Sequence, residues 1–436
     1  MAGHGRTGGG RGARIPVASL VSLILSTGGF IAMAPSAHAT TVTTFTWTGK
    51  AAKAAHGADD NWSDGANWKG GAAPSAPGPV DLAFSTRSCS KKAPGCATSN
   101  NDISGLTVQT LTLKGKAGKA TASPPAIDLT GDALTVAGGI DETTKLPKKG
   151  SFSFPELFVD LPVQLSGDET WNMSTGEVGF GAPVTGSVNL SIDLQNQGGI
   201  GFDATGNTIG SLTASGPGLL FIAPGASLNT AGNPVTVKNG SILYAVGAVG
   251  PLATSSAGVD VGNIGSPYGT LQVDGTIALD SGSNLSLYDL TAGSGTPVPG
   301  TDFPQVLATG AAALGSAGLN VYADCGLPLG TAYTLLDASG GLSGTFTEGA
   351  SMPSPGTTIT SGTTVLAPED LAHDASCTTA TPSYLQFAST ADTMTATVVA
   401  APAAGSRHRR LAHPLPAGEV VAVPRADGGA GLETLR

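Results

Sequence analysis

The residues with the clearest chemical capacity are two pairs of adjacent carboxylates, Asp168-Glu169 and Glu369-Asp370. Glycoside hydrolases use two carboxyl groups, one as the acid and the other as base or nucleophile. Trp171 follows the first pair, and a carboxylate pair beside an aromatic ring can bind a sugar. Neither pair has the companion Gly-His-Gly or Arg-x-Lys sequence that hydrolysis of a uronate polymer uses. We therefore interpret Asp168-Glu169 as a solvated corner, with sugar binding beside Trp171 as the alternative.

General-base chemistry has little support elsewhere in the chain. Beyond the first forty residues, the histidines are His56, His373, His408 and His413. The last two fall in a C-terminal tail, so His373 is the one base for a Ser-His-Asp triad in the body, and we interpret it as an exposed loop residue. A polysaccharide lyase needs an arginine or lysine base, yet residues 151–400 contain Lys238 as their single basic residue. We predict a non-enzymatic protein with no catalytic residues.

The chain contains four cysteines, Cys89, Cys96, Cys325 and Cys377. An even number in an exported chain favours disulfides. Three pairings are open, and proximity in the sequence suggests Cys89 with Cys96 and Cys325 with Cys377. A zinc site would need C-x₂-C-type spacing or nearby histidines, and the sequence has neither. We therefore predict no metal site.

Residues 198–206, GGIGFDATG, match the start of the calcium-binding nonapeptide G-G-x-G-x-D-x-U-x. Thr205 stands where that repeat has a large apolar residue. Calcium ions in such repeats lie between successive turns, so tandem copies are required, and the chain has one copy. We interpret the match as a chance occurrence in a glycine-rich chain and predict no cofactor.

Residues 1–39 have the form of a secretory signal peptide. Three arginines precede an apolar run over residues 15–33, and Ala37-His38-Ala39 offers an A-x-A cleavage site. An uncleaved membrane anchor is the alternative, but the run is short and is interrupted by Ser, Thr and Gly. No later segment reaches the ~20 apolar residues of a membrane span. We expect a secreted or cell-surface protein with no transmembrane segment after signal removal.

The body of the chain is acidic. Residues 151–400 carry nineteen acidic residues against one lysine, and the formal net charge of the whole chain is −10. Such a surface repels nucleic acid and anionic lipid. We therefore predict no nucleic-acid partner.

Short alternating strands are clearest in residues 269–290, GTLQVDGTIALDSGSNLSLYDL. Leu271, Val273, Ile277 and Leu279 alternate with other residues, and Gly, Asp, Ser and Asn separate the runs. One such turn cannot bury its own apolar face, so turns must stack, with roughly 18–25 residues in each. This pattern predicts an all-β parallel β-helix, or β-solenoid. The alternative is a pair of antiparallel β-sandwiches, which also have short, regularly spaced strands.

We divide the chain into five segments: a signal peptide (1–39), an opening and cap segment (40–102), a β-helix body (103–300), C-terminal β-helix turns with a finishing region (301–399) and a disordered tail (400–436). The tail is rich in Pro, Ala and Arg and has no strand pattern beyond Val420 to Val423.

Three of the four tryptophans, Trp47, Trp62 and Trp68, fall in the opening segment. Trp62 and Trp68 are candidates for a carbohydrate-stacking platform. The first turn of a solenoid also exposes an apolar end and open backbone edges that must be covered. We favour a tryptophan-rich N-terminal cap, with sugar stacking as the alternative.

The opening segment contains Trp47-Thr48-Gly49, NWS and NW ahead of a Pro-rich turn, and residues 269–290 are followed by TDFPQVLATGAAAL and YTLLDASGGLSGTF. Over residues 42–399 these motifs resemble autotransporter-passenger-like β-helix proteins, of the type with autotransporter-associated β-strand repeats. The resemblance implies a right-handed parallel β-helix that serves adhesion or forms a structural stalk, and it carries over no catalytic residues. The chain departs from the family because it ends in LETLR, without the alternating strands of a translocator barrel.

These features predict an exported non-enzymatic β-helix protein, adhesin-like or structural at the cell surface or in the medium. The alternative is a glycan-binding or glycan-hydrolysing β-helix that uses Asp168, Glu169 and Trp171. The partners we consider are a surface glycan or another cell-surface component.

Overall fold

The computed structural model of the chain describes residues 42–51, 60–76, 78–86, 98–115, 118–119, 126–144, 152–153, 156–196, 198–262, 269–291, 296–324, 326–352, 354–366, 383–401, 420–424 and 430–434. These residues all belong to one compact unit, Val42–Arg436.

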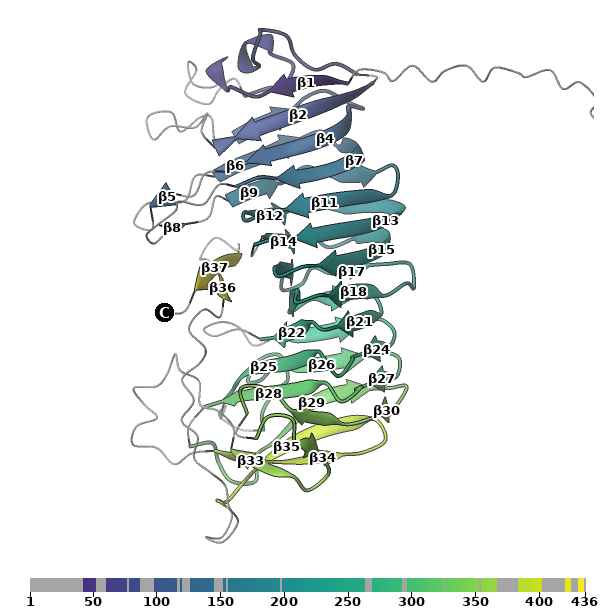
Figure 1. Ribbon diagram of the computed structural model, residues 1–436, viewed down its shortest axis with the longest axis vertical. Helices are drawn as coiled ribbons and strands as arrows, with labels where there is room; N and C mark the ends of the chain where they lie inside the picture. Colours follow the sequence, from purple (N-terminus) through teal and green to yellow (C-terminus); the bar gives the residue numbers. More distant parts are fainter. Residues whose placement is uncertain are drawn as a thin grey trace, which may run out of the picture. The chain divides into compact units, whose positions relative to one another are not determined.

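Two long sheets, mostly of parallel strands, coil around a shared interior (Figure 1). Within the described residues, a 12-stranded sheet contains β3 (Thr98–Asn101), β6 (Ala126–Gly131), β9 (Glu156–Val159), β12 (Glu177–Phe180), β14 (Gly199–Phe202), β16 (Leu219–Ile222), β19 (Ile242–Ala245), β22 (Gly258–Val261), β25 (Asn284–Leu290), β28 (Gly318–Ala323), β31 (Phe346–Glu348) and β32 (Thr358–Ile359).

A 21-stranded sheet forms the rest of the coil. It contains β1 (Thr43–Thr46), β2 (Pro79–Ser85), β4 (Thr107–Lys114), β7 (Leu134–Glu142), β10 (Val163–Leu165), β11 (Glu169–Met173), β13 (Val184–Leu194), β15 (Asn207–Ser215), β17 (Ser227–Asn229), β18 (Val235–Lys238), β20 (Ala248–Val249), β21 (Leu252–Ser255), β23 (Thr270–Val273), β24 (Ile277–Ala278), β26 (Gln305–Ala308), β27 (Ala312–Ala313), β29 (Ala332–Ala338), β30 (Leu342–Ser343), β33 (Thr364–Leu366), β34 (Tyr384–Ser389) and β35 (Thr393–Val399).

Smaller elements complete the described structure. A 3-10 turn, η1, covers Gly65–Asn67. β5 (Gly118–Lys119) pairs antiparallel with β8 (Phe152–Ser153), and β36 (Val420–Pro424) pairs antiparallel with β37 (Ala430–Thr434). In the described part of the chain, no helix is long and apolar enough to cross a membrane.

Strands one turn apart pair in parallel, which confirms the predicted β-helix. β25, for example, pairs with β22 on one side and β28 on the other, both in parallel. Parallel pairing of this kind requires a crossover between partners, and here the rest of each turn supplies it. The antiparallel β-sandwich alternative is therefore wrong.

The length of a turn varies along the coil. Ser211 lies one turn after Asn189, a separation of 22 residues that falls within the predicted range. Asn320 lies one turn after Ser286, a separation of 34 residues. The later turn is longer because a long connection separates β25 from β26, and a surface connection can lengthen without disturbing the strand ladder.

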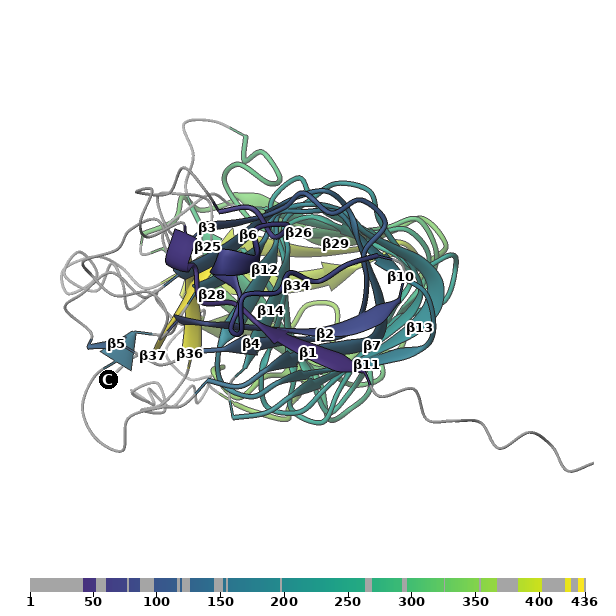
Figure 2. The ribbon, with the colours of Figure 1, turned by 90° about the horizontal axis from the view of Figure 1, so that it is seen from above.

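Small and medium apolar side chains fill the interior. In residues 269–290, the alternating positions predicted to face inward are all buried: Leu271, Val273, Ile277, Leu279, Leu285 and Leu287. Viewed from above, strands of both sheets, such as β13 and β14, border the same interior (Figure 2). Aromatic rings also stack inside the coil, with Trp171 on Phe180 and Phe180 on Phe202.

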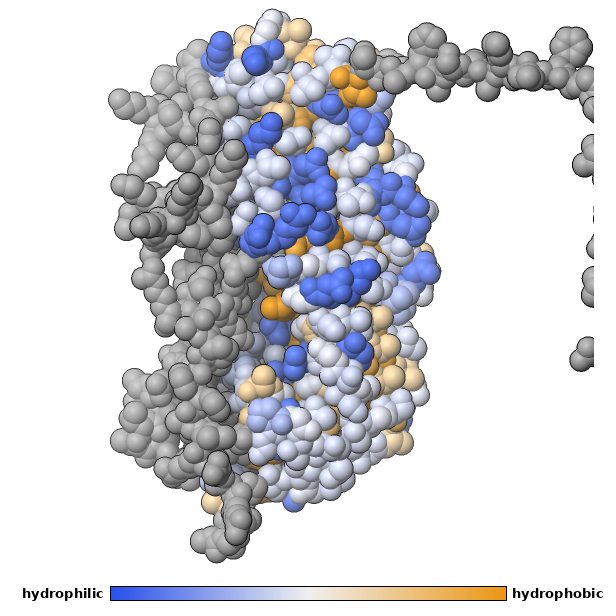
Figure 3. All heavy atoms as spheres, in the orientation of Figure 1, coloured by the Kyte–Doolittle hydropathy of each residue, from blue (hydrophilic) through white to orange (hydrophobic). Residues whose placement is uncertain are grey.

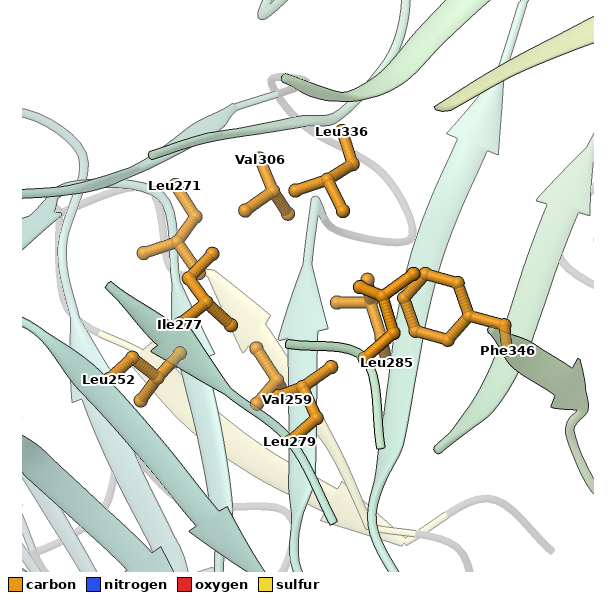
Figure 4. A pocket seen from close by; sticks show the side chains of 10 residues that line it. Leu252, Val259, Leu271, Ile277, Leu279, Leu285, Val306, Leu336 and Phe346 are labelled. Carbon is orange, nitrogen blue, oxygen red and sulfur yellow. The ribbon is translucent and has the colours of Figure 1, made fainter. Parts of the chain in front are cut away.

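A void of about 10 Å³ lies inside the later turns (Figure 4). Its lining is entirely apolar: Leu252, Val259, Leu271, Ile277, Leu279, Leu285, Val306, Leu314, Leu336 and Phe346. A void of this size holds at most about one water molecule, and it offers a water no polar partner. We interpret it as a packing gap where small side chains meet, and not as a ligand site.

The tryptophans of the opening segment form a cap, as the sequence predicts. Trp62 and Trp68 are 0% and 2% exposed, and their ring centroids are 6.1 Å apart in an edge-to-face arrangement. Trp47 and Phe84 pack against the same cluster. The Trp62 indole N–H donates to Ser99 Oγ at 3.0 Å, which fixes the ring over the first turn. Neither Trp62 nor Trp68 presents a free ring face, so the carbohydrate-stacking alternative is wrong.

The C-terminal end of the coil is closed by strands that run in the opposite direction. β29 continues the parallel ladder from β26 and then pairs antiparallel with β35, which pairs with β34. β33 extends this antiparallel group. The sequence predicts a finishing region here but does not predict the reversal of strand direction.

The predicted disordered tail contains the paired strands β36 and β37, and β36 includes the strand pattern noted at Val420 to Val423. The remainder of residues 402–436 lies outside the described residues. The prediction of disorder for the tail as a whole stays a prediction.

The exposed face of the 21-stranded sheet changes character along the coil. Hydrophilic side chains gather over the turns from β7 to β18, and the turns around β24 to β30 are paler (Figure 3). One outward row illustrates the change, because Thr213 and Thr236 give way to Ala253, Ala278 and Ala313 in register.

A buried carboxylate fixes one corner of the coil. Glu142 is 0% exposed, and its Oε2 accepts backbone N–H bonds from Ser174, Thr175 and Gly176 at 3.0, 3.0 and 2.8 Å. The Thr144 hydroxyl donates to the other carboxylate oxygen. Three consecutive backbone donors on the next turn thus depend on this single side chain.

Replacement of Glu142 by Ala should cost roughly 3 kcal/mol of unfolding free energy, because three buried donors lose their acceptor. Denaturant unfolding monitored by circular dichroism measures the loss. The matched control is Asp141→Ala, which removes a partly exposed carboxylate bonded to Asn172 Nδ2 and should cost about 1 kcal/mol or less. Equal losses for the two variants would contradict the role given to Glu142.

Candidate binding surface

The outer face of the 12-stranded sheet carries acids and aromatic rings on neighbouring turns. In β9, Leu157 and Val159 are buried in the core, so Phe158 and the following Asp160 face outward by strand alternation. In β14, Phe202 is buried and Asp203 follows it outward. The surface is therefore built from positions between and just after the inward core residues.

Strand register assembles these residues into a row. One outward row reads Asp128, Phe158, Gly179, Gly201, Phe221, Tyr244, Asp260, Ser286 and Asn320. We call Asp128, Asp160, Glu177 and Asp203 the acidic patch. We call the rings Phe158, Phe221 and Tyr244 the aromatic row; Phe221 and Tyr244 are each only 7% exposed. Phe221 and Tyr244 stack with their centroids 5.3 Å apart.

Glycines form the floor between these side chains. A Cβ atom at Gly181 would lie 2.1 Å from Asp160 Oδ1, a distance that no real side chain tolerates. A Cβ atom at Gly179 would lie 3.2 Å from the ring of Phe158, and one at Gly201 would lie 3.4 Å from the ring of Phe221. The carboxylate and both rings thus lean over bare backbone.

The carboxyl groups of Asp128 and Asp160 are hydrogen bonded to each other. The pKa of Asp128 is raised to about 6. Burial is the largest cause, and the charge and hydrogen bond of Asp160 and the charge of Asp60 add to it. The nearby carboxylates thus oppose ionisation of Asp128, because like charges repel at short range.

The other two members of the acidic patch are also hard to ionise. Burial raises the pKa of Asp203 to about 6, with a contribution from the charge of Asp160. Burial raises the pKa of Glu177 to about 8, with a contribution from the charge of Asp203. Burial is the larger cause of both shifts, and a neighbouring carboxylate adds to each.

Acidic and aromatic side chains on one outer face can bind a ligand. Carboxylates accept hydrogen bonds from cations and from sugar hydroxyls, and aromatic faces attract both. The surface therefore has the chemistry of a site for an organic cation or a polyhydroxylated ligand.

The acid and aromatic residues predicted from sequence are not brought together on the surface. Trp171 is 0% exposed and stacks inside the coil, and its N–H donates to Glu169 Oε2 at 2.8 Å. Glu169 is buried as well, and burial raises its pKa. The sugar-binding alternative for Asp168, Glu169 and Trp171 is wrong, because Glu169 and Trp171 alternate into the core.

Asp168 lies apart from Glu169 on an exposed corner. Its carboxylate accepts from the backbone N–H and the side-chain amide of Asn189 at 2.9 and 3.0 Å. These two bonds hold its pKa below the usual range. Asp168 thus ties one turn to the next.

Several predicted features fall outside the described residues. The four cysteines and their disulfide pairing, Glu369-Asp370 and His373 all lie there. Those predictions stay as the sequence states them.

Sequence reasoning missed the acidic patch. Its members fall at irregular spacings in the chain, because the connections between strands differ in length, and no single motif contains two of them. One signal was available: Asp203 is the acid of GGIGFDATG, which forms β14 and the corner after it. A search for outward acids beside inward core residues on every strand would have found Asp160 and Asp203.

No family model, curated protein or solved structure matches the chain.

The raised pKa values predict that stability falls as pH rises. Between pH 4.5 and about 8 the folded protein keeps a proton on Glu177 that the unfolded chain has lost, so each pH step favours unfolding. Glu177→Gln removes this cost and should stabilise the protein at pH 8.5 by at least about 1 kcal/mol, the equivalent of one pKa unit. At pH 4 the variant and the wild type should be alike.

Asp168→Asn serves as the control of opposite sign. Because the pKa of Asp168 is lowered in the folded protein, its carboxylate stabilises the fold above the unfolded-state pKa of 3.8, and this stability is lost as pH falls. The variant should therefore be less stable than the wild type at neutral pH. Thermal unfolding from pH 4 to 9 measures both effects. A Glu177→Gln variant that is less stable at pH 8.5 would contradict the prediction.

Proposed function

We propose that the protein is an exported, non-enzymatic β-helix that acts as an adhesin-like or structural protein at the cell surface or in the medium. The acidic patch and the aromatic row form its contact surface for another surface component. The signal-like residues 1–39 and the resemblance to autotransporter passengers support export.

The observation that carries this proposal is the register of the outer face. Outward side chains recur at the ~4.8 Å spacing of hydrogen-bonded turns, so the acids and rings form an extended row instead of an isolated catalytic pair. A row of this kind suits a ligand that is itself extended.

A glycan ligand is the second candidate, favoured by two outward rings beside carboxylates. Phe158 is half-buried beside Gly179 and can contact the apolar face of a sugar ring, whereas Phe221, beside Gly201, is only 7% exposed. Asp203 lies beside the same glycines and can accept from sugar hydroxyls. A glycan-hydrolysing protein would bind the glycan at the same surface and would also cleave it.

The test presents the purified mature chain to a panel of cell-envelope and plant or microbial polysaccharides. Binding is measured by affinity electrophoresis, and hydrolysis is measured by the release of reducing ends. We expect saturable binding without release, and Asp160→Asn with Asp203→Asn should weaken binding at least about tenfold, the loss of about 1.4 kcal/mol of contacts.

Thr213→Ala with Thr236→Ala is the matched control, because it changes two outward residues on the 21-stranded sheet and should leave binding unchanged. Reducing-end release that depends on Asp160 would establish the hydrolase instead. Loss of binding in the control alone would move the contact surface to the other sheet.

A further inference from the structure

We propose that Asn239 is a site of spontaneous covalent modification that the stacking of the turns holds inactive. The reaction is intramolecular deamidation, and Asn239-Gly240 is the single Asn-Gly pair in the chain. Glycine has no Cβ atom, so its backbone nitrogen is the least hindered nucleophile that can follow an asparagine. The proposal is independent of the function proposed above.

The chemistry needs water as its one co-reactant. The backbone nitrogen of Gly240 attacks Cγ of Asn239, so that an N–Cγ bond forms and the Cγ–Nδ2 bond breaks. The proton of the Gly240 nitrogen and the side-chain amide group leave together as ammonia. The resulting succinimide ring then takes up one water, which opens either of its two carbonyl groups. One opening gives aspartate, and the other gives isoaspartate, in which the main chain runs through the side-chain carbon.

Asn239 and Gly240 are the central residues of a tight turn between β18 and β19. Their φ angles are +58° and +85°, and the Ser241 N–H donates to Lys238 O at 3.3 Å across the turn. Positive φ at both central residues is the pattern of a type I′ turn, for which Asn-Gly is a favoured pair. Both residues are exposed, so water reaches them. The turn geometry therefore accounts for a reactive pair at an exposed corner.

The neighbouring turns hold the two reacting groups apart. The Gly240 N–H donates to Ser256 O at 2.7 Å, on the turn that follows. Asn239 Nδ2 donates to Ser215 Oγ at 2.9 Å, on the turn that precedes. The strands of these three turns, β15, β18 and β21, follow one another along the coil (Figure 1). The nucleophile and the amide that it must attack are thus bonded to opposite neighbours.

Reaction requires close approach of the nitrogen to Cγ, because an intramolecular step is fast only from a near-attack geometry. The Asn239 N–H also donates to Ser255 O at 3.0 Å, which fixes the backbone of the corner. The corner must therefore release Gly240 from Ser256 O, and the Asn239 side chain must turn away from Ser215. Local opening of this kind is a minor state of a folded protein. We expect the folded coil to deamidate more slowly than the unfolded chain.

Isoaspartate at this corner prevents the turns from restacking. It adds one backbone carbon between the N–H groups of residues 239 and 240, which donate to the consecutive carbonyl groups of Ser255 and Ser256. The two bonds cannot then keep their register, because a strand ladder depends on a fixed spacing between residues. Aspartate, in contrast, tolerates positive φ and accepts a hydrogen bond from the Ser215 hydroxyl. Opening of the corner becomes irreversible once isoaspartate forms.

The first experiment incubates the mature chain at pH 8, folded in buffer or unfolded in guanidinium chloride, and follows the peptide that contains Asn239 by mass spectrometry. We expect the folded chain to lose this asparagine at least about tenfold more slowly, because the corner must open first. Ser215→Ala frees the side-chain amide and should raise the folded-state rate at least about threefold. Ser211→Ala is the matched control on β15, because its hydroxyl donates to Asn189 Oδ1, and it should leave the rate unchanged.

Circular dichroism establishes that both serine variants are folded during the incubation. Equal rates in the folded and unfolded chains would overturn the proposal, as would an unfolded chain in which Asn239 does not react. A Ser215→Ala rate no higher than the Ser211→Ala rate would also overturn it, because the side-chain bond would then hold nothing back.

The second experiment measures what the modification does to the coil. Protein aged in the folded state is separated into forms that carry asparagine, aspartate or isoaspartate at position 239, and the Tm of each form is measured. The isoaspartate form should unfold at a Tm lower by about 2 °C or more. Asn239→Asp supplies the aspartate form by mutation and should unfold close to the wild type. An isoaspartate form as stable as the wild type would refute the loss of register at this corner.

Discussion

The structure depends on one constraint: each turn must place its strands within hydrogen-bonding distance of the turns on both sides. This ladder fixes a spacing of ~4.8 Å between equivalent residues and aligns them into rows. Inside the coil the rows are apolar, and each turn buries its face only because a neighbour covers it. The two ends lack one neighbour, which explains the tryptophan cluster at one end and the antiparallel strands at the other.

Because of the same constraint, outward side chains on neighbouring turns lie close together and act as a group. An isolated aspartate on a strand is a solvated side chain, but aspartates on neighbouring turns lie close enough to interact, and the charge of Asp160 helps to raise the pKa of Asp128. Glycine acts in the opposite sense, because Gly179, Gly181 and Gly201 leave room that the adjacent rings and carboxylate occupy. The acidic patch is thus a product of stacking, and it brings together residues that no local motif joins.

Charge is distributed unevenly along the chain that forms this patch. Residues 151–400 carry nineteen acidic residues against one lysine, whereas the other basic residues lie before residue 151 and after residue 400.

The sequence by itself determined the class of fold and the residues of the core. Alternation over residues 269–290 predicted which side chains point inward, and local turn residues predicted where strands end, because both are properties of a few consecutive residues. Tertiary structure alone decided the site. The sequence allowed Trp171 and Glu169 to form a sugar site at the surface beside Asp168. Strand alternation in β11 instead points both side chains into the interior. Conversely, Asp128, Asp160, Glu177 and Asp203 become neighbours only through pairing between turns, and loops of unequal length conceal that register from the sequence.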